Sequence, residues 1–166
     1  MTTPEFDPVG LLDVLNRHGV GYVVIGGFAA VAYGSPLPTA DIDITPAPGP
    51  DNLARLSNAL RDLDARVRVD GVDEGLAFAH NAESLRAVTV LNLLTRLGPL
   101  DLVVRPAGGA DYEALAERQL VVTLHGVTVP LASFDDIIAS KEAAGRPKDR
   151  QALPLLRALR DRLAGG

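Results

Sequence analysis

The sequence contains no cysteine, which excludes disulfide bonds and zinc sites built on thiolates. It also lacks a long apolar run. The longest one, from Val20 to Ala32, is interrupted by three glycines and is too short to cross a bilayer. The N-terminus has neither the basic region nor the apolar region of a secretory signal. We therefore expect a cytoplasmic protein that has no membrane partner.

Lysine is almost absent. Lys141 and Lys148 are the only two in the chain, and every other basic residue apart from histidine is arginine. In a chain that otherwise uses arginine, a lysine suggests a site that needs a compact point charge, such as a phosphate contact. The simpler alternative is that both lysines lie on a solvated charged face. Both lysines lie in the segment 141–162, which has seven basic and three acidic residues in a chain of net charge −5. This asymmetry indicates a polyanionic ligand.

The length of 166 residues, with 47% hydrophobic and 22% charged residues, is typical of one soluble domain. We predict a core over residues 1–132 and a C-terminal helical segment, 133–166, that completes the same domain. Strands and helices alternate first and strands then cluster. This order predicts an α/β (α+β) fold, a mixed sheet flanked by helices on one face, with a short helical tail.

Hydrophobic periodicity, caps and turn residues set the expected elements. Helices are expected at 8–18, 28–33, 50–63, 111–117, 134–144 and 147–163. Strands are expected at 22–25, 40–45, 66–69, 87–94, 100–104, 120–124 and 127–129. Residues 70–83 are expected to form a surface excursion with a short helix.

The most informative motif is Asp41-Ile42-Asp43-Ile44. In a strand, the two aspartates project from one face while the isoleucines enter the core. Two adjacent like charges are unfavourable unless a cation lies between them, and paired carboxylates suit Mg²⁺. A solvated edge strand is the alternative, but the isoleucines favour an internal strand.

Two further features complete a candidate site. Gly26-Gly27 falls at a strand-to-helix turn, where glycine lets phosphate approach the backbone; a tight turn without a ligand is the alternative. Asp101 lies inside an apolar strand, where an unpaired acid is unfavourable. If that strand lies beside the Asp41–Asp43 strand, three carboxylates converge. Three carboxylates can hold two metal ions, one activating a hydroxyl and the other holding a triphosphate.

Together these motifs resemble a known family. Gly26-Gly27, thirteen intervening residues and then Asp41-Ile42-Asp43-Ile44 resemble the signature of the DNA-polymerase-β-like nucleotidyltransferase superfamily. Within it, the runs 39–44 and 141–149 are similar to small bacterial nucleotidyltransferases of the AbiEii toxin type. The resemblance spans about residues 22–157.

The resemblance implies roles for individual residues. Asp41, Asp43 and Asp101 would be catalytic and would bind two Mg²⁺ ions, or Mn²⁺, with Asp101 as general base. Gly26 and Gly27 would form the nucleotide-phosphate turn, and Lys141 and Lys148 would contact phosphate. Gly27 departs from the serine that many relatives carry, so Ser35 or Thr39 is expected to supply that hydroxyl. Pro38 departs from a position that is often basic.

The function that follows is transfer of a nucleoside monophosphate from a nucleoside triphosphate, such as ATP, to a hydroxyl. A tRNA 3′ end fits the toxin resemblance, which also implies a cognate antitoxin. On one helical face, Arg146, Arg150 and Arg157 could touch its phosphates. An aminoglycoside or lincosamide hydroxyl fits the small size and the acidic body, and a protein Tyr or Ser is a third acceptor. The alternative of another class is a non-catalytic nucleotide-binding module.

Overall fold

A mixed sheet of eight strands forms the centre of the computed structural model, which describes residues 5–165. The strands are β1 (Tyr22–Ile25), β2 (Ile42–Pro46), β3 (Arg66–Val69), β4 (Val72–Leu76), β5 (Val90–Thr95), β6 (Gly98–Val103), β7 (Leu120–Leu124) and β8 (Val127–Leu131). Their order is β4-β3-β5-β6-β2-β1-β8-β7. The pairs β1–β8 and β2–β6 are parallel, and the other neighbours are antiparallel. The mixed sheet is therefore the one expected from the sequence.

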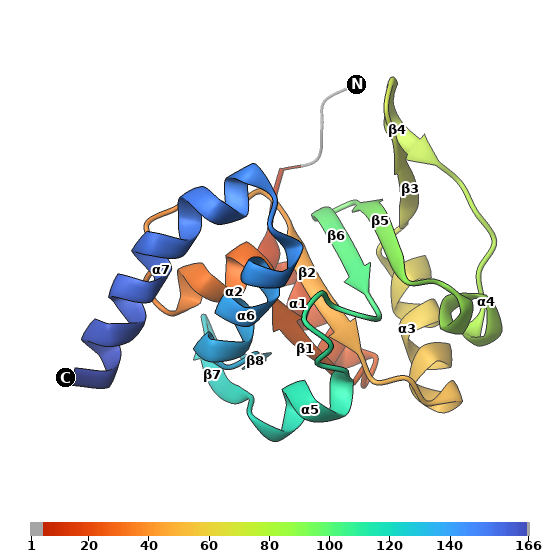
Figure 1. Cartoon of the computed structure of the whole chain (residues 1–166). Coiled ribbons are helices and arrows are strands. Elements are labelled where there is room, and N and C mark those ends of the chain that lie inside the picture. Colours follow the sequence, from red (N-terminus) through yellow and green to blue (C-terminus); the bar gives the residue numbers. More distant parts are fainter. Residues whose placement is uncertain (1–4, 166) are drawn as a thin grey trace.

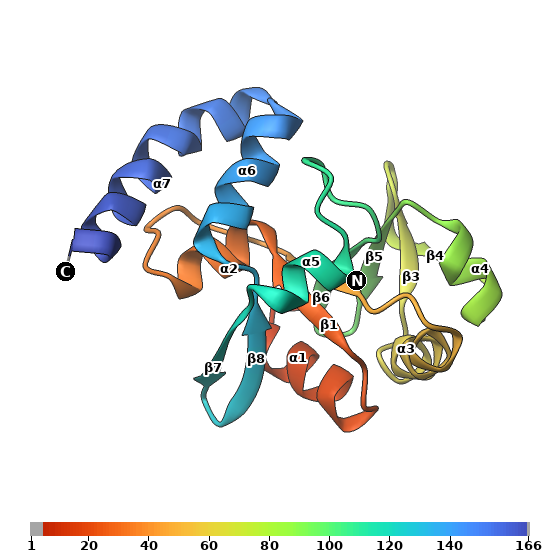
Figure 2. The same cartoon turned by 60° about the horizontal axis from the view of Figure 1, so that its bottom comes forward.

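Helices lie on both sides of this sheet. They are α1 (Pro8–Arg17), α2 (Gly26–Ala32), α3 (Pro50–Asp62), α4 (Ala82–Ala87), α5 (Tyr112–Glu117), α6 (Phe134–Ala144) and α7 (Pro147–Gly165). The two cartoon views place α1 and α3 on one side, with α5 and α6 toward the other (Figures 1 and 2). Helix α7 runs outward from the end of α6 to the C-terminus (Figure 1).

One face of the sheet is apolar because of the strand registers. Ile42 and Ile44 of β2 pair with Leu100 and Leu102 of β6, and residues paired in register point to the same face. All four are at most 1% exposed. They share one core with the buried leucines of α1 and α3: Leu11, Leu12, Leu15, Leu53, Leu56 and Leu60. The isoleucines therefore enter the core as the alternation predicts.

The opposite face is covered only in part. Val23 and Val24 of β1 point to opposite faces, yet neither is exposed, so both faces are covered at this strand. Ile25 lines a cavity with Leu115 of α5 and Ile137 of α6, which places these two helices over β1. The expectation of helices on one face alone was wrong, because the apolar β1 has two faces to bury.

Caps and turns follow the expected chemistry. The Asp7 carboxylate accepts a hydrogen bond of 2.9 Å from the Gly10 amide and begins α1. Ser133 accepts one of 3.1 Å from the Asp136 amide and begins α6. His125 and Gly126 have φ of 48° and 81° and close the β7–β8 hairpin. These local signals were confirmed.

The excursion at 70–83 differs from its prediction. Gly71, at φ 82°, turns the chain into strand β4, which pairs with β3 as a hairpin. The helix comes later, as α4, where the Asn81 side chain accepts a hydrogen bond of 2.9 Å from the Ser84 amide. The predicted strand at 87–94 therefore starts only at Val90. The alternation of apolar and polar residues over Val72–Leu76 was too short to predict strand β4.

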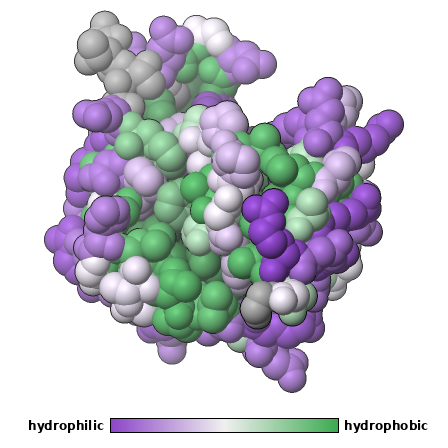
Figure 3. Space-filling model, turned by 90° about the vertical axis from the view of Figure 1, so that its left-hand side faces the viewer, coloured by the Kyte–Doolittle hydropathy of each residue, from purple (hydrophilic) through white to green (hydrophobic). Residues whose placement is uncertain are grey.

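The surface beside α7 and α2 is notably apolar (Figure 3). Among the exposed apolar side chains of these elements, Val31 of α2, Leu37 of the loop after α2 and Leu163 of α7 are 37%, 38% and 52% exposed. Within residues 5–165, no helix combines the length and the apolar character needed to cross a membrane. The signal-peptide expectation concerns in part residues 1–4, which lie outside the described residues.

Candidate functional site

Three carboxylates converge where β2 and β6 lie side by side. The parallel register pairs Asp43 directly with Asp101, so both point to the polar face of the sheet. The sequence predicted Asp41 within a strand, but it lies in a bend just before β2. One carboxylate oxygen from each aspartate lies within 4.8 Å of the others. The predicted cluster of three acids is therefore a feature of the structure, whereas the catalytic roles stay predictions.

The cluster is electrostatically strained without a cation. Burial, followed by the negative charge of Asp41, raises the pKa of Asp43 to about 8. Burial also raises the pKa of Asp101, against the opposing effect of the Arg68 guanidinium. The raised pKa means that, without a cation, Asp43 keeps a proton at neutral pH. Three carboxylate oxygens at this spacing form the hard ligand set that Mg²⁺ or Mn²⁺ prefers. The residues therefore fit a divalent metal.

A cleft of about 560 Å³ opens beside Asp41 and Asp43. Its wall combines glycines, hydroxyls, cations and apolar side chains: Gly26, Gly27, Ala30, Ser35, Leu37, Pro38, Thr39, Ala40, Lys141, Arg146, Lys148, Gln151, Ala152 and Leu156. Every residue proposed from the sequence for nucleotide binding is in this wall. Lys148 also lowers the pKa of Asp43 by its charge, which places it in electrostatic reach of the cluster.

The glycine turn is shaped around Asp43. Ile25, the last residue of β1, pairs with Asp43, and the next residue, Gly26, has φ of 73°. A Cβ added to Gly26 would collide with the Asp43 carboxylate. Gly27 has no such constraint: its added Cβ would meet Thr39 Oγ1 at 3.2 Å. Only the first glycine is therefore required by the backbone.

The two hydroxyls expected to replace a turn serine are held locally. Thr39 Oγ1 donates to the Asp41 carbonyl at 3.2 Å, which ties it to the acidic bend. Ser35 is 6% exposed, and its Oγ accepts from the Leu37 amide at 3.3 Å. The Ser35 hydroxyl keeps its proton as a donor for the cleft, whereas that of Thr39 is already used.

A buried acid orders the cationic side of the cleft. Asp149, in the first turn of α7, has a fully buried side chain and accepts from Arg146 Nε at 2.7 Å. Lys141 Nζ of α6 lies 3.7 Å from the same carboxylate. Burial raises the pKa of Asp149, but the hydrogen bonds and charge of Arg146 and the charge of Lys141 outweigh it, so that the pKa is lowered overall. Lys141 is therefore an ion-pair partner as well as a cleft residue, and the pair fixes the α6–α7 joint.

Asp149→Ala is expected to lower the free energy of unfolding by about 3 kcal/mol, because it leaves two cations beside a buried gap. Chemical denaturation measures this. Glu142→Ala is the matched control, since the Glu142–Arg157 pair is 49% and 46% exposed and should contribute at most about 1 kcal/mol. Equal effects of the two substitutions would contradict a structural role for Asp149.

Sequence reasoning missed Arg68. Its Nη2 lies 2.7 Å from Asp101 Oδ1, although β5 separates β3 from β6 in the sheet. The alternation of Arg66 and Arg68 on a predicted strand showed that they share a face. The strand order that brings this face to Asp101 could not be predicted from the sequence.

The arginines proposed to bind RNA are engaged within the chain. Arg146 pairs with Asp149, Arg150 Nε donates to the Gly145 carbonyl at 2.9 Å, and Arg157 pairs with Glu142 at 3.0 Å. Their charges remain partly exposed, but their donors serve the α6–α7 joint. The positive segment is therefore explained in part by local structure.

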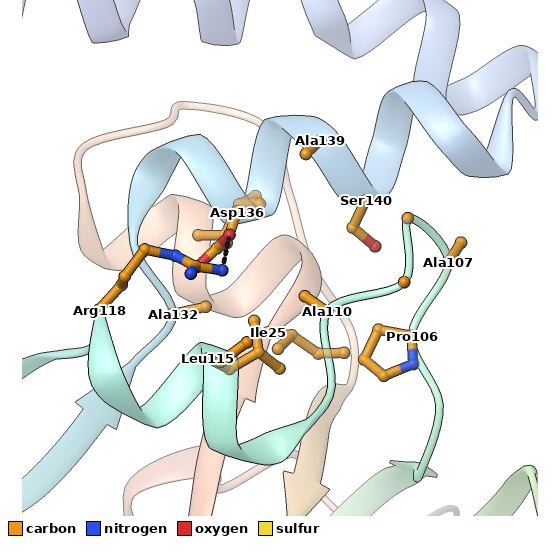
Figure 4. A pocket seen from close by; sticks show the side chains of 14 residues that line it. Ile25, Pro106, Ala107, Ala110, Leu115, Arg118, Ala132, Asp136, Ala139 and Ser140 are labelled. Carbon is orange, nitrogen blue, oxygen red and sulfur yellow. Dashed lines mark hydrogen bonds and ion pairs between the residues drawn. The ribbon is translucent and has the colours of Figure 1, made fainter.

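A second cavity, of about 290 Å³, lies between α5, α6 and the loop 106–110 (Figure 4). Ser140 points into it, whereas the next residue, Lys141, lines the cleft, so the two hollows flank α6. Its charged groups, Arg118 and Asp136, are paired through two hydrogen bonds of 2.9 and 2.8 Å. This cavity is mainly apolar and offers no free charge for phosphate.

No protein-family model matches the sequence, and no curated protein matches it. Solved structures do. The lincosamide antibiotic adenylyltransferase LnuA, bound to lincomycin, has a TM-score of 0.61 at 15% identity, covering 93% of this chain and 99% of that chain. A Thermotoga maritima protein, TM1012, assigned provisionally as a nucleotidyltransferase, has a TM-score of 0.54 at 18% identity, with 87% and 86% covered.

The antibiotic-resistance factor ANT(2'')-Ia is a third similar structure, with a TM-score of 0.51 at 18% identity, covering 95% of this chain and 93% of that chain. Likeness at these identities establishes the fold alone. The chain therefore has the fold found in these nucleotidyltransferases, and the chemistry has to be argued from its own site.

Proposed function

We propose that this protein is a metal-dependent nucleotidyltransferase that moves a nucleoside monophosphate from a nucleoside triphosphate to a hydroxyl. The observation that carries the proposal is the cluster of Asp41, Asp43 and Asp101 at the edge of a cleft with a cationic wall. A fold shared with LnuA and ANT(2'')-Ia supports it. A structural ion-pair network would explain the lysines but gives no role to three adjoining acids.

Asp41, Asp43 and Asp101 would hold Mg²⁺ or Mn²⁺. When bound, divalent ions supply neutralisation of phosphate charge and a lower pKa for the attacking hydroxyl. A carboxylate binds metal in its deprotonated form, and the pKa of Asp43 is raised to about 8, so Asp43 has to lose a proton when a metal binds. Metal affinity should therefore rise with pH toward about 8.

The cleft wall offers two kinds of side chain to a nucleotide. Lys148 would be the main positive charge for the phosphates, because Lys141 and Arg146 are also paired with Asp149. Leu37 and Leu156 would give the nucleoside an apolar wall. Catalysis on this site would be mainly positioning and charge stabilisation.

The transfer itself is one displacement. The acceptor oxygen bonds to the α-phosphorus, the bond from this phosphorus to the oxygen that bridges to the β-phosphorus breaks, and pyrophosphate leaves with the electron pair. Asp101 would take the hydroxyl proton, since it lies at the edge of the cluster toward β5 and β3, where Asn92 and Arg68 are exposed.

We infer that the acceptor is a small-molecule alcohol. LnuA is an antibiotic adenylyltransferase with lincomycin bound, and a net charge of −5 favours a cationic drug. The tRNA alternative of the AbiEii resemblance, with its antitoxin, loses one of its arguments because Arg146, Arg150 and Arg157 serve local contacts.

Incubation with α-labelled nucleoside triphosphates and lincomycin, an aminoglycoside or total tRNA tests both statements. We expect labelled antibiotic and stoichiometric pyrophosphate. Label in nuclease-sensitive RNA would transfer the proposal to tRNA, and label in protein would indicate a Tyr or Ser acceptor. Nucleotide binding by calorimetry without pyrophosphate from any acceptor would favour the non-catalytic module.

A further inference from the structure

Arg68 joins the edge of the sheet to the carboxylate cluster. It lies on β3, whose hairpin with β4 forms one end of the sheet (Figure 1). The pairing of Val67 with Leu93 and of Leu93 with Leu100 puts Val67 on the apolar face, so Arg68 is on the polar face with Asp101. Its side chain reaches across β5 to meet the acid.

The contact is well suited to hold one orientation of the carboxylate. Arg68 Nη2 donates to Asp101 Oδ1 at 2.7 Å, a charge-assisted hydrogen bond. The Asp101 side chain is 13% exposed and that of Arg68 38%, so the acid end of the pair is largely shielded from water. Asp101 Oδ1 is fixed by this bond, and the carboxylate plane is restricted.

Arg68 approaches the cluster from the side opposite to the nucleotide cleft. The cleft wall includes Asp41 and Asp43 but neither Asp101 nor Arg68. Beyond Asp101 lies the polar face of β6, β5 and β3, where Asn92 is exposed next to Asp101. This exposed face gives a hydroxyl an approach to Asp101 from outside the cleft.

We propose that Arg68 is a positioning residue for the acceptor step. By binding Asp101 Oδ1, Arg68 orients the carboxylate so that Asp101 Oδ2 faces the attacking hydroxyl and the cluster. The inference rests on the proposed nucleotidyl transfer. Hydrogen-bond partners of metal-ligating carboxylates typically change affinity or activity by about 10- to 100-fold when removed. A reacting group misplaced by about 1 Å loses a similar factor.

Removal of Arg68 should change the transfer rate and the affinity for a cation in opposite directions. Arg68→Met frees Asp101 to rotate, which slows transfer. It also deletes a positive charge next to three carboxylates, which strengthens the attraction of a cation. We therefore expect kcat to fall by about 10- to 100-fold. The KM for nucleotide should change little, and Mn²⁺ binding to the nucleotide-free protein should be equal to or tighter than in the wild type.

The experiment compares Arg68→Met, Arg68→Lys and Arg66→Met. Turnover of labelled ATP is measured on whichever of lincomycin, the aminoglycoside or tRNA the wild type labels, and Mn²⁺ affinity is measured by electron paramagnetic resonance. Arg68→Lys keeps the charge with a single-point donor and should regain part of kcat. Arg66 lies on the same strand and face, but its guanidinium bonds the Glu74 and Gly75 carbonyls, so Arg66→Met controls for loss of charge there.

A kcat of Arg68→Met within twofold of the wild type would overturn the inference, and so would an equal loss of kcat in Arg66→Met. A parallel loss of Mn²⁺ affinity would also overturn it, since Arg68 would then support metal binding and not the acceptor step. A wild type that labels neither antibiotic, nor tRNA, nor protein, and that releases no pyrophosphate, overturns the proposed function itself, and this inference falls with it. Thermal melting shows whether each variant is folded.

Discussion

Asp43→Asn is expected to reduce nucleotidyl transfer by about 10³-fold or more while the fold stays intact. Asp43 is the central acid of the cluster: it pairs with Asp101 in register and is charge-coupled to Asp41. An amide is neutral and cannot replace a carboxylate between cations. Loss of several kcal/mol of charge stabilisation at the reacting phosphate corresponds to a factor of this size.

The same substitution should stabilise the metal-free protein. The pKa of Asp43 is raised from 3.8 to about 8 in the fold, so the folded chain holds a proton that the unfolded chain releases. Stability from this group is complete below about pH 4 and is lost as the pH rises toward about 8. Asparagine has no such titration. At about pH 8 we expect a gain of at least about 1 kcal/mol, or roughly 2–4 °C in Tm.

Thermal melts at about pH 5 and about pH 8, with and without millimolar MgCl₂, measure this effect. Mg²⁺ should raise the Tm of the wild type at the higher pH and leave Asp43→Asn unchanged, since a ligand stabilises only the state that binds it. Asp73→Asn, on exposed β4, is the control for loss of an acidic charge. Wild-type transfer by Asp43→Asn would disprove the assignment of the active site.

The sequence predicted local elements better than their arrangement. Caps such as Asp7 and Ser133 depend on residues a few positions apart, so short motifs determine them. The convergence of Asp101 with Asp43 is a different case: it required β6 to lie beside β2, which the apolar pattern permitted but did not specify. The resemblance supplied that step, and the parallel register bears out the expected adjacency.

Long-range features were the ones that sequence reasoning missed. Arg68 reaches Asp101 across β5, and the strand order that permits this is visible only in the fold. The sequence did not distinguish Asp149 from the other charged residues of its segment, yet Asp149 is buried and pairs with Lys141 and Arg146. Both cases have the same cause: the partner of a charged side chain depends on packing between elements, whereas sequence patterning reports which face a residue occupies.

Gly26→Ala is expected to reduce transfer by about 10²-fold or more and to destabilise the protein, whereas Gly27→Ala should do neither to the same degree. Gly26 has φ of 73°, where an L-residue costs roughly 1–2 kcal/mol. Its new methyl would also displace the Asp43 carboxylate. A misplaced ligand of this kind loses about 10²-fold in rate.

Gly27 is the matched control one residue away. Its backbone has no positive φ, and its new methyl would meet only Thr39 Oγ1 at 3.2 Å, so a shift of a few tenths of an ångström accommodates it. Alanine also favours the helix over glycine by roughly 1 kcal/mol. Denaturation curves and steady-state kinetics on both variants measure the contrast. Equal behaviour of the two would mean that neither the left-handed turn at Gly26 nor its close contact with Asp43 matters for transfer, because these two features distinguish the positions.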